Sequence, residues 1–484
     1  MNSSLANTTM KGKDQMKSSH SCIPSASSQL LQKCCIRGNQ KGKHDCDLPC
    51  SFSSESHVLS TVKIFEMAQA QLLHHMSKKE DDPSIASQPL NSHSDLSLEV
   101  SDDLQLALLL QASAEMFSKR HYERAMELLS LCNLSASLTG TPVQRVVYYY
   151  SEALRERIDK ETKSITGLQL DRLVDFEVKP AGVEELFLCS KPHVIVCYRA
   201  LPFYQVAQFA CIQAILDNVK SEKRLHLIDF GIRSGSHWTI LMQALANRGD
   251  CPLELLKITA IGTSKQVVDE TGKRLSSFAA ENMKFSFFFK AVVSEMKDLS
   301  KDLFELDTNE VVVVYSEYIL GGMLAWPNHL EVVLRFIKNL NPCVIVVIET
   351  EANTNEPIFM DRFNGSVFLY AALFDCLEAF MERDNQHRME FERLVLREVI
   401  HNVITCEGEG RIFRNVRLEV WRAVFEKFGI KETELSESSL YQANLMADRS
   451  AHGFCTLDMD GNCLTIKWNG TPIVFASAWK FVHD

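Results

Sequence analysis

The sequence of 484 residues lacks an uninterrupted apolar run of the roughly 18 residues that a membrane-spanning helix needs. Its first residues, Met1 to Met10, also lack the apolar core of a secretory signal peptide. The 15 cysteines are odd in number and thinly spread, which is typical of reduced thiols in the cytosol or nucleus. These absences predict a chain that is neither secreted nor embedded in a membrane.

Positive charge is also in short supply, since the net charge is −11. Residues 1–57 carry seven Lys and Arg against four acids, which leaves 44 basic and 58 acidic residues, or −14, in the rest of the chain. A folded region with net negative charge is a poor non-specific binder of nucleic acid, because contacts with phosphates need a positive electrostatic potential. A local basic patch is compatible with this composition, so direct DNA contact stays an open alternative.

The first part of the chain, residues 1–101, is polar and is expected to be largely disordered, apart from one amphipathic helix near 59–77. It holds zinc-type ligands at Cys35, His44, Cys46 and Cys50. Their spacing contains no Cys-x-x-Cys pair, and His44 and Cys46 are almost adjacent, which fits tetrahedral coordination poorly. The sequence therefore predicts free cysteines and no metal site.

Residues 102–220 show apolar side chains at helical spacing and predict a helical cap. Thr141 and Pro142 form a helix start, and Pro202 starts another helix. From Leu225 onward, strands alternate with helices, which predicts a mostly parallel, Rossmann-like sheet over 221–484. The expected strands are 225–229, 256–262, 285–293, 311–315 and 343–349, and Asp460-Gly461 marks an antiparallel hairpin near the C-terminus.

Residues 224–238 combine a buried strand, a glycine turn and a helix start, the arrangement that opens a nucleotide-binding unit. The strand ends at Asp229, and Gly231, Gly235 and Ser236 follow. A working site also needs an acid about 20 residues further on for the ribose. The second strand instead ends in Ile261-Gly-Thr-Ser-Lys265, and bulky Ile232 and Arg233 occupy the turn. No cofactor is therefore predicted, and an S-adenosylmethionine-type methyltransferase, or a small-molecule sensor derived from one, is the alternative.

Glu349 and Glu351 lie two residues apart at the end of a predicted strand, with Asn353 beside them. Together they predict a polar ligand pocket that faces Asp229. The structural alternative is that both glutamates cap or bridge to Arg362 and neighbouring loops. Acid–base catalysis would also need a nucleophile or a metal, which the sequence does not supply, so no catalytic residue is assigned.

The leucines of Leu106-Ala-Leu-Leu-Leu110 satisfy a Leu-x-x-Leu-Leu pattern of helix-in-groove contacts. Leu106, Leu109 and Leu110 are thus candidate partner-binding residues, with burial in the core as the alternative.

Several long motifs, taken in order, resemble the plant GRAS domain over residues 102–484. Leu104–Lys163, with Thr141–Val146, is similar to its first leucine-rich region, and Leu225-His-Leu-Ile-Asp229 stands where the family has Val-His-Ile-Ile-Asp. The remaining matches are Glu349-Thr-Glu-Ala-Asn-Thr-Asn355 with Phe363 and Leu373-Phe-Asp375, Arg417-Leu-Glu-Val-Trp421, and Phe475-Ala-Ser-Ala-Trp479. Within the family the chain looks most similar to the DELLA-like branch, although its N-terminal segment contains no Asp-Glu-Leu-Leu-Ala element.

The resemblance implies a nuclear transcription regulator of plant development, hormone, stress or symbiosis responses, and no enzyme. Its implied partners are other GRAS chains and DNA-bound transcription factors, with direct DNA binding as a variant and no membrane. The combined expectation is a Rossmann-like, methyltransferase-like α/β fold with an N-terminal helical cap and a C-terminal antiparallel hairpin.

Overall fold

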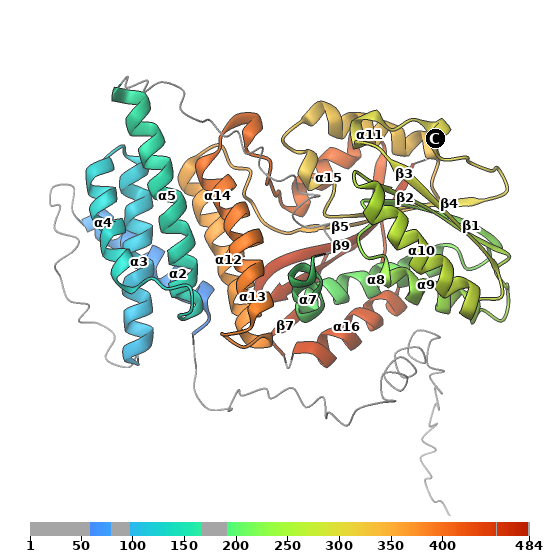
Figure 1. Ribbon diagram of the computed structural model, residues 1–484, viewed down its shortest axis with the longest axis horizontal. Helices are drawn as coiled ribbons and strands as arrows, with labels where there is room; N and C mark the ends of the chain where they lie inside the picture. Colours follow the sequence, from blue (N-terminus) through green and yellow to red (C-terminus); the bar gives the residue numbers. More distant parts are fainter. Residues whose placement is uncertain (1–58, 79–96, 167–190, 452, 483–484) are drawn as a thin grey trace, which may run out of the picture.

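The computed structural model describes residues 59–78, 97–166, 191–451 and 453–482. A helical bundle lies beside a twisted sheet that is covered by helices on both faces (Figure 1). The strands are β1 (Arg224–Phe230), β2 (Leu255–Gly262), β3 (Ser286–Val293), β4 (Val311–Glu317), β5 (Val344–Thr350), β6 (Ile430–Thr433), β7 (Cys455–Asp460), β8 (Cys463–Trp468) and β9 (Thr471–Phe481). The predicted zinc-type residues and the polar N-terminal region before residue 59 lie outside the described residues.

The helices come from both halves of the chain. They are α2 (Thr61–Lys78), α3 (Leu98–Ser118), α4 (Tyr122–Ser135), α5 (Pro142–Thr166), α7 (Pro192–Ala200), α8 (Pro202–Asn218), α9 (Ser236–Ala246), α10 (Lys265–Asn282), α11 (Pro327–Leu340), α12 (Phe359–Phe380), α13 (Gln386–Phe391), α14 (Arg397–Thr405), α15 (Leu418–Glu426) and α16 (Glu437–Ala451). A π-helical turn, Glu392–Leu396, joins α13 to α14. The helix expected near 59–77 is α2, and the helix starts expected at Pro142 and Pro202 are those of α5 and α8.

The sheet has the order β3-β2-β1-β4-β5-β9-β8-β7, and β6 pairs with β9 beside this path. β1 to β5 are parallel, and β9 runs antiparallel to β5 and β8. This confirms the mostly parallel α/β fold and the C-terminal antiparallel hairpin, which turns at Asp460–Gly461. β6 and β9 were not among the strands expected from the sequence, and β9 lies inside the sheet.

The two faces of the sheet bury separate apolar clusters, as expected for strands covered on both sides. Leu225 and Leu227 of β1 belong to the cluster under α8, α9 and α10, whereas Ile228 and Phe230 belong to the cluster under α11 and α15. Side chains alternate between faces along a strand. Asp229 therefore lies on the same face as Leu227, toward α9.

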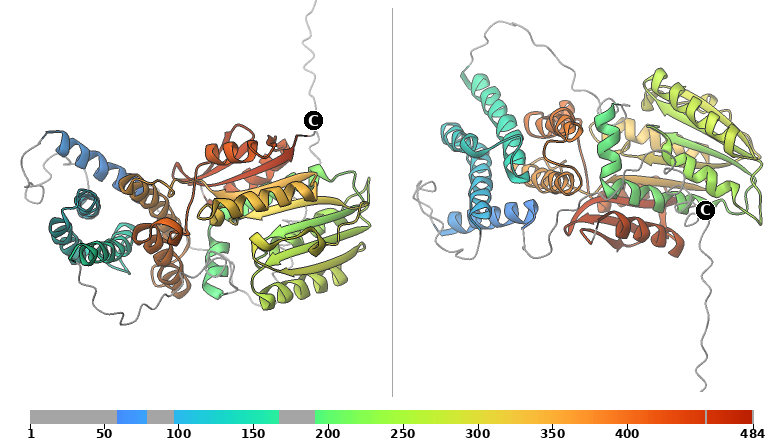
Figure 2. Two further views of the ribbon diagram at one scale, coloured as in Figure 1. Left: turned by 90° about the horizontal axis from the view of Figure 1, so that it is seen from above. Right: turned by 60° about the horizontal axis from the view of Figure 1, so that its bottom comes forward.

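The helical bundle is not confined to residues 102–220, where the sequence placed the cap. α12 and α14, which follow β5, pack against α2, α3 and α5 and complete the bundle (Figure 2). α8, by contrast, packs on β5, β9 and α16 and belongs to the sheet layer. α12 is long and apolar enough by composition to cross a membrane, but 56% of its most apolar stretch is buried inside the protein.

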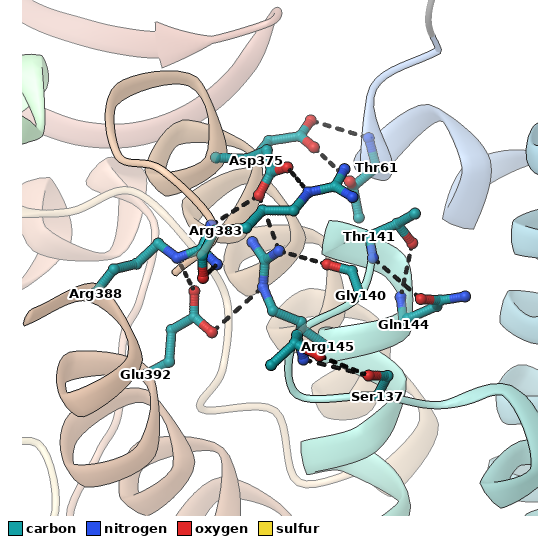
Figure 3. Close-up of polar contacts among 12 residues, drawn as sticks. Thr61, Ser137, Gly140, Thr141, Gln144, Arg145, Asp375, Arg383, Arg388 and Glu392 are labelled. Atoms are coloured by element: carbon teal, nitrogen blue, oxygen red, sulfur yellow. Dashed lines mark hydrogen bonds and ion pairs between the residues drawn. The ribbon is translucent and has the colours of Figure 1, made fainter. Parts of the chain in front are cut away.

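The start of α5 is fixed by a reciprocal capping box. The Gln144 backbone N–H donates to Thr141 Oγ1 at 3.2 Å, and the Thr141 N–H donates to Gln144 Oε1 at 3.1 Å. Pro142 occupies the first turn, where its missing N–H costs nothing. The capped first turn of α5 lies close to α12, where Arg145 contacts Glu378 (Figure 3).

A buried ionic network joins α5 to α12 and α13. Arg145 contacts Glu378 Oε2 at 2.9 Å and Glu392 Oε2 at 3.3 Å, and its side chain is fully buried. Arg388, also fully buried, contacts the same two glutamates at 2.8 and 3.6 Å (Figure 3). Since buried charges need partners, the network fixes how the two halves of the bundle meet.

We expect Arg145→Ala to lower the free energy of unfolding by about 3 to 5 kcal/mol, because Glu378 and Glu392 would lose a buried partner. The matched control is Arg335→Ala, which breaks an exposed pair with Glu331 on α11 and should cost less than about 0.5 kcal/mol. Urea unfolding followed by circular dichroism measures both. Equal effects of the two substitutions would show that the network adds nothing to stability.

Candidate functional site

Asp229 is the last residue but one of β1 and lies beside β4, where the strand order of the sheet reverses and open α/β sheets bind their ligands. The indole Nε1 of Trp238 donates a hydrogen bond to Asp229 Oδ2 at 2.8 Å. Asp229 is 2% exposed, and Trp238 is completely buried with its ring edge against Tyr315 of β4, at 4.7 Å between centroids. An aromatic side chain therefore covers the carboxyl ends of β1 and β4.

The glycine turn after β1 is packed against protein. Gly231 and Gly235 have φ angles of 97° and 61°, which favour glycine. A Cβ on Gly235 would lie 2.9 Å from Thr271 Cγ2 of α10. Thr271 Oγ1 also donates to the Arg233 carbonyl at 3.1 Å. Gly235 thus allows the turn to lie close to α10. The exposed Ser236 hydroxyl contacts the Ser234 hydroxyl at 3.0 Å.

The expected pocket that joins Glu349 to Asp229 is not formed. Asp229 pairs with Tyr315, and Tyr315 pairs with Val346 of β5. Glu349 lies three residues beyond Val346, so it faces the opposite side of the sheet, with Val347. There the Gly321 N–H donates to Glu349 Oε1 at 3.0 Å.

The other two pocket candidates have structural contacts. Glu351 Oε2 accepts from the Leu418 N–H at 2.9 Å and so caps the start of α15. Asn353 donates to Glu356 through its side chain, and its carbonyl oxygen lies against Gly365 of α12. Arg362 is paired with Glu407 and with neither Glu349 nor Glu351. These contacts match the capping alternative for Glu351.

The structure brings Glu317 to the site, a residue that the sequence reasoning missed. Glu317 lies two residues beyond Tyr315 on β4 and therefore on the same face as Asp229. Its carboxylate accepts from the Tyr315 hydroxyl at 2.9 Å and from Gln208 Nε2 at 3.1 Å. Arg233 Nη1 lies 3.9 Å from it. The available signal was a carboxylate that follows the apolar run 311–315 at the carboxyl end of a strand.

Tyr198 and Tyr318 contact the Arg233 guanidinium, and Tyr204 packs against both tyrosines. The guanidinium carbon lies 4.6 Å from the Tyr198 ring centroid and 5.1 Å from that of Tyr318, within cation–π range. Tyr198 stacks on Tyr204 at 3.9 Å, and Tyr204 meets Tyr318 edge-on at 5.6 Å. The Arg233 side chain therefore occupies the space beside the turn after β1, where the rings of Tyr198 and Tyr318 stabilise its positive charge.

Burial sets the protonation states of this region. It raises the pKa of Asp229 to about 7, against the lowering effect of the Trp238 hydrogen bond, and raises the pKa of Glu349 to about 7. It lowers the pKa of His237 to about 4, so this imidazole is neutral at pH 7. Within the described ranges, no group of three or more His, Cys, Asp and Glu side chains could hold a metal ion. The polar side chains of this region are therefore placed to form hydrogen bonds.

The predicted partner-binding leucines lie mostly inside the bundle. Leu106 and Leu110 are buried in its core, and Leu109 is half-buried against it. As placed, Leu106 and Leu110 cannot contact a partner, because the apolar face of α3 is used for packing. Exposed leucines of the bundle include Leu98 at the start of α3 and two on α4: Leu134 is 81% exposed, and Leu131 shares its face.

Comparisons of this chain with known families, relatives and solved structures point to one family. A model of the GRAS domain family matches residues 106–480. DELLA protein RGL1 of Arabidopsis thaliana is 29% identical over 78% of this chain and 70% of its own length. DELLA protein GAIP of Cucurbita maxima is 31% identical over 78% of this chain and 62% of its own. The crystal structure of SCL7 from Oryza sativa matches with 25% identity and a TM-score of 0.67, over 78% of this chain and 99% of that one.

Asp229→Asn should change how stability depends on pH. A carboxyl whose pKa is about 7 when folded and about 4 when unfolded holds its proton more tightly in the folded chain. Stability therefore falls as pH rises from 4 to 7, and Asn, which still accepts from Trp238, removes this loss. The free energy of unfolding, measured at pH 4 and at pH 8, should show this difference. Between the two pH values the variant should gain up to about 4 kcal/mol relative to wild type. The exposed control Asp302→Asn should follow wild type, and parallel profiles for Asp229→Asn would contradict the assignment.

Proposed function

Because this chain belongs to the GRAS domain family, we propose that it is a nuclear regulator of transcription in plant development, hormone, stress or symbiosis responses. It acts through protein partners, which are other GRAS chains or DNA-bound transcription factors. Its relatives include DELLA proteins of several plants, which supports a regulator over other classes of protein. The chain spans 62% of the length of some of these relatives, so the partners belong to the proposal.

The main support for this proposal is that the Trp238 side chain fills the position where proteins of this fold bind a ligand. In a nucleotide-binding α/β protein, the turn after the first strand approaches a ligand with its backbone. Here Asp229 already has a protein donor, and Gly235 lies against α10. This supports a scaffold in which the α/β half has kept its architecture and presents surfaces to partners.

The rival function is an S-adenosylmethionine-dependent methyltransferase or a sensor derived from one. It requires the turn at Gly231–Gly235 to admit the cofactor, and the buried Ile232 and Trp238 side chains oppose this. Isothermal titration calorimetry of the full chain with S-adenosylmethionine separates the two. We expect no heat of binding at millimolar cofactor, and saturable binding would favour the rival.

The partner surface that we propose is the outer face of α4. Leu131 and Leu134 are exposed there, three residues apart, on a bundle whose other apolar side chains are mostly packed. Exposed apolar side chains that gather on one helix face are typical of helix-mediated recognition. Direct DNA contact is a second route, which would show binding that weakens steeply with salt.

A fusion of the full chain to a heterologous DNA-binding domain should alter reporter expression in plant nuclei. Leu131→Asp/Leu134→Asp should remove the effect and weaken binding to a GRAS partner about tenfold or more, since it places charge in the contact. The matched control is Val332→Asp/Val420→Asp, which changes two exposed valines on α11 and α15 and should act like wild type.

A fusion that enters the nucleus and leaves the reporter at its baseline would refute the regulator proposal. Equal effects of the two double variants would refute only the α4 surface.

A further inference from the structure

A cavity of about 100 Å³ lies where the helical bundle meets the carboxyl ends of β4 and β5. α7, α12 and α13 lie side by side at this junction (Figure 1). Its walls are mostly aromatic and aliphatic, and they include Tyr204, Tyr318, Leu373 and Leu396, with Glu349 at one end. An apolar cavity of about 150 Å³ accepts benzene. The space in this protein is smaller but partly open to solvent, so it can hold one small ring that extends toward the opening, or a short branched hydrocarbon, and it is too narrow for a helix.

Tyr318 has two unfavourable features at once. Its φ angle is 57°, in the left-handed region that a bulky residue rarely adopts. Its hydroxyl is buried and has no hydrogen-bond partner among the described residues. Both the strained backbone and the unsatisfied buried hydroxyl are unfavourable to the folded state.

The surroundings hold Tyr318 in this position. Its N–H donates to the Ile348 carbonyl at 2.9 Å, and its ring is fixed between the Arg233 guanidinium and Tyr204. A strained residue with a free donor at a cavity wall is the arrangement expected where a ligand supplies the missing acceptor.

The charged groups at the cavity already have partners. Glu349 accepts from the Gly321 N–H. Arg414 donates to the Arg411 carbonyl and to Asn355 Oδ1, at 2.7 and 3.0 Å. A charged ligand would therefore enter without a free counter-charge, which is costly in an apolar space. The ligand that fits is uncharged.

We propose that this cavity binds a small, uncharged, mostly hydrocarbon molecule with one oxygen atom that accepts a hydrogen bond from Tyr318. The π-helical turn Glu392–Leu396 contributes Leu396 to the wall, and such turns are frequent at functional sites. The site adjoins the turn after β1 through Tyr204 and Tyr318, but Asp229 and Trp238 do not line it, and it does not depend on the regulator proposal.

The test uses p-cresol and toluene as probes of the full chain, which differ by one hydroxyl. Ligand-detected NMR with a concentration series gives the affinity of each. Wild type should bind p-cresol more tightly than toluene. Tyr318→Phe, which keeps the ring, should weaken p-cresol binding about threefold to tenfold and leave toluene binding unchanged.

Leu373→Trp should abolish the binding of both probes by filling the cavity. Val332→Trp, a matched change at an exposed position of α11, should leave both affinities unchanged. Circular dichroism checks that each variant folds. If Leu373→Trp does not fold, the comparison of wild type with Tyr318→Phe tests the proposal. The proposal is overturned if wild type binds neither probe at millimolar concentration, if Tyr318→Phe keeps the preference for p-cresol, or if folded Leu373→Trp binds like wild type.

Discussion

The hydrogen bond from the Trp238 indole to Asp229 is the contact on which the α/β half of the molecule depends. A carboxyl at the end of a central strand, taken out of water, needs a donor. In this chain the donor comes from the helix that follows the glycine turn. The indole then packs on Tyr315, whose hydroxyl donates to Glu317, so the ends of β1 and β4 are closed by side chains. The fold keeps the geometry of a ligand-binding sheet and satisfies its polar groups internally.

A second constraint links the two halves of the molecule. The segment that follows β5 leaves the sheet, forms α12 to α14 in the bundle, and returns as α15 and β6. The bundle is therefore built from residues on both sides of the central strands, and Arg145 of α5 meets Glu378 of α12 inside it. Neither half has a complete core without the other, so stability is shared across the whole domain.

Features that depend on near neighbours in sequence could be predicted. The strands near 225–229 and 256–262 and the α5 start at Thr141-Pro142 followed from apolar runs and capping chemistry. The orientation of Glu349 could not, because it depends on the register of β5 against β4. β9 was missed even though its neighbour β8 lies directly before it in sequence. Its pairing with β5 could not be predicted, because β5 lies more than a hundred residues earlier. Glu317 carries a local signal, because it follows an apolar run at the end of a strand. Its contact with Arg233, like that of Tyr318, is tertiary and could not be predicted.

The position of β9 in the sheet has a consequence for biosynthesis. β9 is the strand furthest along the chain, and it alone joins β6 and the β7–β8 hairpin to β5 among the described strands. Since translation proceeds toward the C-terminus, β5 has to wait on the ribosome with an open edge while more than a hundred residues are added. An exposed strand edge attracts other chains. The nascent protein is thus most exposed to aggregation during the interval between synthesis of β5 and release of β9, which is when a chaperone would act on it.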